Sequence, residues 1–135
     1  MSAPFAAPRQ VVVQPQATAG SNLNTNVLIC PQDGTVSSVT YAPVTAITGA
    51  NTNTRSVSLV NKGQAGSGST VIATIQYNSG VNAAAADENT VTLSGTPANL
   101  AVSAGDILQW QSTAVGTGIA DPGGLIAITI GVKYA

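Results

Sequence analysis

The fold of this chain is decided by one stretch near its end, Leu125-Ile126-Ala127-Ile128-Thr129-Ile130-Gly131-Val132-Lys133-Tyr134. From Ile126 onward every second residue is large and apolar or aromatic, and the residues between them are small or polar. An apolar residue at every second position predicts a β-strand with one buried face and one outward face. The stretch therefore predicts a long strand at the border of a hydrophobic core.

A second strand is predicted just before it, over residues 107–111. Leu108 and Trp110 share one face of this strand, and Trp110 is the only tryptophan of the chain. A large indole against β-branched residues is the expected anchor of a core. We expect the two strands to run antiparallel and to close one side of a β-sandwich. The loop 116–124 between them is expected to be exposed or to lie at a contact between subunits.

The rest of the chain repeats this pattern in short segments separated by Gly, Pro, Asn and Asp. The further predicted strands cover residues 9–14, 27–30, 35–41 (resuming at 44–47), 55–61, 70–77 and 90–94. Segments 55–61 and 70–77 predict a hairpin with Val57, Leu59, Val71, Ala73, Ile75 and Tyr77 turned inward. The Ala-rich segment 83–88 is too short for more than one helical turn.

This spacing predicts an all-β, antiparallel sandwich or barrel of about eight strands. A jelly-roll topology is favoured over an immunoglobulin-like sandwich, because the paired cysteines around a tryptophan are missing. Residues 16–135 are expected to form this single domain, and residues 1–15 an extended N-terminal arm. Segment 9–14 is either the first strand of the sandwich or an arm that adds to the sheet edge of a neighbour.

Charge is scarce in this chain, with 7% charged residues and a net charge of -1. The basic residues Arg9, Arg55, Lys62 and Lys133 are scattered, which argues against nucleic acid and membrane surfaces as partners. A surface built from uncharged polar residues solubilises a free monomer poorly, so partners or further copies are expected to cover much of it. No signal peptide or apolar span is apparent, which predicts a protein that is not secreted.

The inventory of reactive side chains is equally poor. The chain has no histidine, which removes the common nucleophilic triads and the commonest zinc ligand. Asp33, Asp106 and Asp121 each lie in a turn, where a carboxylate is expected to accept backbone N–H bonds. Asp87 and Glu88 are sequence neighbours and do not oppose each other across a substrate. We therefore predict no enzyme, no cofactor and no metal site.

The remaining side chains of interest are assigned to the core. Cys30 follows an apolar run and is expected to be a buried thiol. Sugar-binding surfaces stack their ligands on exposed aromatic rings, whereas the aromatic residues here occupy inward strand positions. Core positions are predicted for Trp110, Tyr41, Tyr77 and Tyr134.

A family resemblance is carried by the segment Val102-Ser103-Ala104-Gly105-Asp106-Ile107-Leu108-Gln109-Trp110. It resembles a corner of small jelly-roll proteins in which Ala-Gly-Asp precedes a tryptophan-bearing strand. With the Gly-rich loop 116–124 and the closing strand, it is similar to the head decoration, or cement, proteins of tailed bacteriophages. The resemblance covers about residues 20–135.

The resemblance implies a homotrimer on the outer surface of a phage head, made in the host cytoplasm. Its partners would be the major capsid protein, whose contacts it stabilises, and further copies of itself. It also implies an N-terminal arm that contacts the capsid or a neighbouring subunit. The contact residues would be Arg9, Gln10, Val11, Val12 and Val13. The alternative is a receptor- or glycan-binding fibre module of the same fold.

Overall fold

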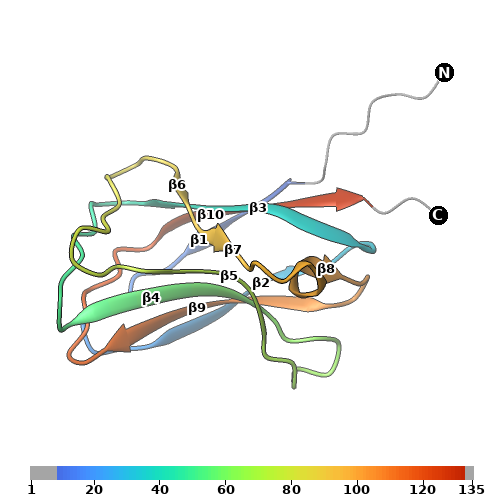
Figure 1. The fold of residues 1–135 in the computed structure, drawn as a ribbon, viewed down its shortest axis with the longest axis horizontal. Helices are drawn as coiled ribbons and strands as arrows, with labels where there is room; N and C mark the ends of the chain where they lie inside the picture. Colours follow the sequence, from blue (N-terminus) through green and yellow to red (C-terminus); the bar gives the residue numbers. More distant parts are fainter. Residues whose placement is uncertain (1–8, 133–135) are drawn as a thin grey trace.

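The computed structural model describes residues 9–132, which form two facing β-sheets (Figure 1). The first sheet contains, in order, β1 (Arg9–Gln14), β10 (Gly124–Val132), β3 (Gly34–Pro43) and β6 (Asn89–Thr90), and β8 (Ala101–Val102) also pairs with β3. The second sheet contains, in order, β2 (Leu23–Ile29), β9 (Ile107–Val115), β4 (Thr54–Asn61), β5 (Thr70–Gln76) and β7 (Thr92–Leu93). The ladders between these strands are antiparallel. The predicted all-β sandwich is confirmed.

The core lies between the sheets and follows the predicted alternation. On β10, Ile126, Ile128 and Ile130 are fully buried, and Leu108 and Trp110 face them from β9. The ring of Trp110 lies 5.5 Å from that of Tyr41 on β3, at an interplanar angle of 49°. This distance is typical of favourable aromatic pairs. Trp110 is thus the anchor of the core, as predicted.

The predicted pairing of the two closing strands is wrong. Strand β9 pairs with β2 and β4, whereas β10 pairs with β1 and β3, so the two lie in opposite sheets. The segment 116–123 that joins them crosses from one sheet to the other. Alternation in the sequence specifies which face of a strand is buried but not which strand lies beside it. Here the two apolar faces meet across the core instead of side by side.

The predicted hairpin is formed by β4 and β5, but part of its inner face is wrong. The register shifts between Leu59 and Val60, which pair with Ala73 and Val71. A bulge of this kind changes which side chains point inward. As a result Ile72 is fully buried, whereas Val71, which was expected inside, is 41% exposed.

Two smaller elements complete the description. In the Ala-rich segment 83–88, Ala83 forms an isolated β-bridge with Ile47 and a turn follows at residues 85–86. A short 3-10 helix, η1 (Pro97–Leu100), follows β7. Within residues 9–132 no helix is long and apolar enough to cross a membrane.

The N-terminal segment 9–14 is the first strand of the sandwich. Strand β1 pairs with β10 along its whole length, from Arg9 opposite Thr129 to Gln14 opposite Gly124. Residues 9–14 thus lie within the domain rather than in a separate arm, and residues 1–8 lie outside the described residues.

Candidate interaction surface

An exposed apolar surface occupies one end of the outer side of the first sheet. It consists of side chains from β1, β10, β3 and the residue after β3, and we call it the apolar face: Val11, Val13, Ala42, Val44 and Leu125. The exposed fractions are 70% for Val13, 64% for Val44, 56% for Val11 and 48% for Leu125. Isolated exposed apolar residues are ordinary, but a contiguous group marks an interaction site.

Strand register brings these side chains together. Val13 lies opposite Leu125, and Leu125 lies opposite Ala42, so the three form one row across β1, β10 and β3. Residues opposite each other in antiparallel strands point to the same face. Val44 joins this row because its backbone N–H donates to the carbonyl of Gly123 at 2.8 Å.

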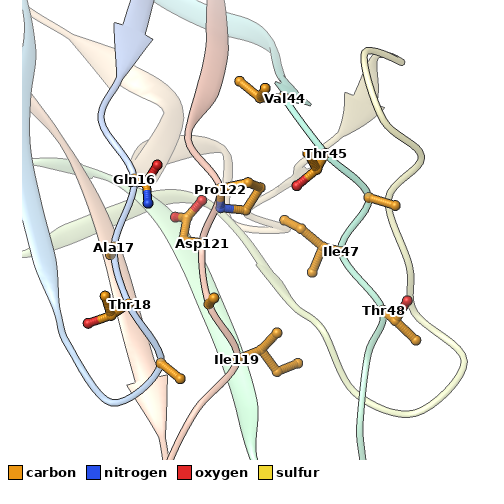
Figure 2. A pocket seen from close by; sticks show the side chains of 13 residues that line it. Gln16, Ala17, Thr18, Val44, Thr45, Ile47, Thr48, Ile119, Asp121 and Pro122 are labelled. Atoms are coloured by element: carbon orange, nitrogen blue, oxygen red, sulfur yellow. The ribbon is translucent and has the colours of Figure 1, made fainter.

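Two hollows lie in and beside the apolar face. The first, of about 360 Å³, is lined by Val13, Ala42, Pro43, Val44, Ala86, Gly124 and Leu125. The second, of about 510 Å³, lies at one end of the sandwich between segments 16–19, 44–48 and 119–122. Figure 2 shows Gln16 to Thr18 on one side of this second hollow, Val44 to Thr48 on the other, and Ile119 to Pro122 between them. Val44 lines both hollows, so they form one continuous surface.

This surface is almost without charge. Asp121 is the single ionisable residue that lines either hollow, and its side chain is fully buried. An uncharged apolar surface attracts neither phosphate groups nor metal ions.

A buried polar network lies beneath this end of the sandwich and centres on Asp121. Its Oδ1 accepts hydrogen bonds from the hydroxyl of Tyr41 (2.6 Å) and the backbone N–H of Gly123 (3.1 Å). Its Oδ2 accepts hydrogen bonds from Nε2 of Gln14 (2.7 Å) and Oγ of Ser112 (2.5 Å). The carboxylate thereby links β1, β3 and β9, which belong to both sheets.

Arg55 supplies the positive charge of this network. Its Nη1 donates to Oγ of Ser112 at 3.0 Å, so that hydroxyl connects the guanidinium to Asp121. The guanidinium also donates hydrogen bonds to three backbone carbonyls of the neighbouring loops. These belong to Ile119 (2.6 Å), Ser21 (3.0 Å) and Thr18 (3.1 Å). Burial lowers the pKa of Arg55, and the negative charge of Asp121 opposes this effect.

The network fixes the loops that surround the end hollow. Besides the bonds of Arg55, the backbones of Ala17 and Asp121 exchange two hydrogen bonds, each of 2.8 Å. Because Tyr41, Arg55, Ser112 and Asp121 are all fully buried, their polar atoms contact one another rather than solvent. We interpret the network as a rigid support for the surface above it.

Two of the five predicted contact residues lie on the apolar face. Val11 and Val13 belong to the apolar face, whereas Val12 packs against the core and Gln10 is half-buried. Arg9 lies at the start of β1, and its side chain is outside the described part.

Several residues of the surface and the network were missed by sequence reasoning, although a signal for some of them was present. Leu125 falls in the outward phase of the strand that carries Ile126 and Ile128. Arg55 falls in the inward phase shared by Val57 and Leu59, so its burial was readable from the same alternation.

Asp106 and Asp33 accept backbone N–H bonds, as predicted. Oδ2 of Asp106 accepts from Ser103 at 2.9 Å within its own turn and from Nδ2 of Asn61 at 3.0 Å. Asp33 accepts from Ala104 at 2.9 Å, far along the chain rather than in its own turn. In the described part of the chain no group of three or more Cys, Asp or Glu side chains is placed to hold a metal ion.

The other residues predicted for the core are buried wherever the structure describes them. Trp110, Tyr41 and Tyr77 are fully buried, and Tyr134 lies outside the described residues. Cys30 is a buried free thiol, and burial raises its pKa. None of the aromatic rings between residues 9 and 132 is therefore exposed for stacking on a sugar.

Comparison of the chain with known protein families, with curated proteins and with solved structures found no match. Its function must therefore be inferred from its own surface and sequence.

Proposed function

We propose that this protein is a structural protein of a tailed-phage particle, a decoration protein that binds the outer surface of the head as a homotrimer. The observation that carries this proposal is the apolar face, an uncharged and exposed surface above a rigid buried network. The corner at residues 102–110 adds the family resemblance. The order of the strands in the two sheets supports the jelly-roll topology that the resemblance implies.

The apolar face would act as the contact with the major capsid protein. Val13, Val44 and Leu125 surround the smaller hollow, which suits an apolar side chain of the partner. Burial of apolar area contributes about 25 cal/mol per Å², so the face supplies binding energy without charged partners. The partner surface is therefore expected to be apolar and poor in charge as well.

The mechanism is thermodynamic. A protein that binds the assembled shell but not dissociated capsid subunits stabilises the shell by mass action. At a free concentration one hundred times the Kd, each occupied site contributes about 2.7 kcal/mol. The contributions of many occupied sites on one shell add together. A modest affinity per site is therefore enough to raise the temperature at which the shell ruptures.

The proposal is tested with heads assembled from the major capsid protein that is encoded with this chain. Purified protein is mixed with expanded heads and sedimented, and the rupture temperature of decorated heads is compared with that of bare heads. We expect cosedimentation, a higher rupture temperature, and a trimeric mass or a multiple of it in light scattering. Protein that stays in the supernatant and leaves the rupture temperature unchanged contradicts the proposal.

A further inference from the structure

Strand β1 is an edge strand whose residues 10–14 carry no charge, bulge or proline to block further pairing. It pairs with β10 on one side, and no strand among the described residues pairs with its other side. It spans six residues, without a register shift in its ladder and without proline. An unprotected edge of this kind is a template for another strand.

The other sheet edges of the described chain differ from β1. Strands β6, β7 and β8 each span two residues, which is too short to template a long ladder. Strand β2 is longer, but its ladder shifts register between Asn26 and Leu28. Short strands and bulges are the devices by which natural sheets block edge pairing. β1 is thus the single long and regular edge in residues 9–132.

The sequence of β1 is a palindrome over residues 10–14, Gln-Val-Val-Val-Gln. A two-fold contact between identical chains requires a self-complementary surface. If two copies of β1 pair antiparallel with Val12 at the centre, Val11 lies opposite Val13 of the other copy, and Gln10 lies opposite Gln14. Like residues then meet on both faces, and no charge falls within the paired segment.

We propose that β1 of one molecule pairs antiparallel with β1 of a second copy across a two-fold axis, in the register that places Val12 opposite Val12. The first sheets of the two molecules then join into one continuous sheet. Opposite residues share a face, so the two apolar faces come to lie side by side on the same surface. This contact does not rest on the proposed capsid function. In a trimeric particle it links one trimer to the next.

The register is tested by disulfide trapping with the single variants Val11→Cys and Val13→Cys in the full chain. Both positions are exposed, and each variant carries a different mass tag. Directly opposite residues lie within the Cα distance that a disulfide spans, whereas diagonal neighbours lie farther apart. We expect the oxidised mixture to yield at least about ten times more cross-linked product than either variant alone, because only the mixture contains the pair 11–13.

A mixture of Val13→Cys with Val71→Cys is the matched control, since Val71 is exposed on β5 in the other sheet. Wild-type protein controls for the buried Cys30. Equal yields from the mixture and the single variants, or no cross-linked product in any sample, overturn the proposed pairing.

The double variant Val11→Lys, Val13→Lys gives a second test on the purified protein without capsids. Four lysines then meet across the junction, so we expect the mass in light scattering to fall to half that of the wild type. Circular dichroism checks that the fold is kept. An unchanged mass contradicts the pairing. Binding of this variant to heads is not a readout of the pairing, because Val11 and Val13 also belong to the apolar face. If these tests show that β1 does not pair but wild-type protein still binds heads, the pairing is wrong and the proposed function stands.

Discussion

At the scale of single residues, Arg55 and Asp121 place opposite charges inside a chain that has few charges. Both side chains are fully buried, and the hydroxyl of Ser112 bridges them. Such an arrangement contributes little net stability compared with an apolar one, but removing one partner leaves an uncompensated buried charge. Its role is to hold the loops around residues 17–22 and 117–122 in one conformation, beneath the end hollow.

Asp121→Asn is expected to lower the free energy of unfolding by about 3 kcal/mol. The substitution removes the charge that compensates Arg55. It also turns one acceptor oxygen into an NH₂ donor, although each oxygen of Asp121 accepts from two donors. Denaturant unfolding measures the change. Asp87→Asn, at an exposed turn, is the control and should change stability by less than about 0.5 kcal/mol. Equal effects of the two substitutions would refute the structural role of the network.

The buried tyrosines predict a loss of stability in alkaline solution. Burial raises the pKa of Tyr77 to about 12, and burial together with the hydrogen bond to Asp121 also raises the pKa of Tyr41. In the unfolded chain both ionise near pH 10. Their contribution to the free energy of unfolding is therefore complete below about pH 10 and is lost as the pH rises toward 12.

For each tyrosine the free energy of unfolding should fall by about 1.4 kcal/mol per pH unit in this range. Denaturant melts at a series of pH values measure the slope, and ultraviolet absorbance follows the ionisation. If all tyrosines of the native protein ionised near pH 10, the burial of these two rings would be contradicted.

At the scale of strands and loops, the alternation of residues predicted most inward faces, but apart from the β4–β5 hairpin it did not predict which strands lie side by side. The inner faces of β9, β10 and β4 are read directly from the sequence, because alternation reports burial. The sequence does not predict that β9 and β10 lie in opposite sheets. Which strands they pair with depends on how the loop 116–123 crosses the sandwich. The phase of β5 changes at a register shift opposite β4, which carries no local signal. The apolar face was only partly predictable for the same reason, since it joins residues from three separate segments of the chain.

Close backbone approach at Gly49 gives a prediction at this scale. A Cβ atom at this position would lie 1.7 Å from the carbonyl oxygen of Asn78 and 2.4 Å from that of Val81. The backbone of segment 78–81 would have to move. We expect Gly49→Ala to destabilise the protein by about 3 kcal/mol or more, as overpacking against backbone allows little relaxation.

Gly95→Ala is the matched control, because a Cβ atom there meets nothing within 4 Å. It should change the midpoint of thermal unfolding by no more than about 2 °C, whereas Gly49→Ala should lower it by about 10 °C. Similar midpoints for both variants would show that segments 48–50 and 78–81 are not packed as described.

At the scale of the whole molecule, a rigid sandwich presents one uncharged apolar face on its first sheet. The second sheet exposes fewer large apolar residues: Ile29, beside a hollow of about 390 Å³ that Leu28 and Ile107 also line, and the separate residues Val71 and Val115. Four of the seven large exposed apolar residues lie on the apolar face of the first sheet. On our proposal the first sheet contacts the capsid. Pairing of two molecules through β1 would place two apolar faces on one surface and so double the apolar area available for that contact.

The most direct test of this account is cosedimentation of the variant Leu125→Lys with expanded heads, beside Val71→Lys as control. Both positions are partly exposed, at 48% and 41%, so either lysine is tolerated by the fold. The proposal predicts that Leu125→Lys weakens binding at least about tenfold, because a charge is then buried against an apolar partner, while Val71→Lys binds like the wild type. Equal binding of both variants and the wild type would contradict the assignment of the apolar face as the capsid contact.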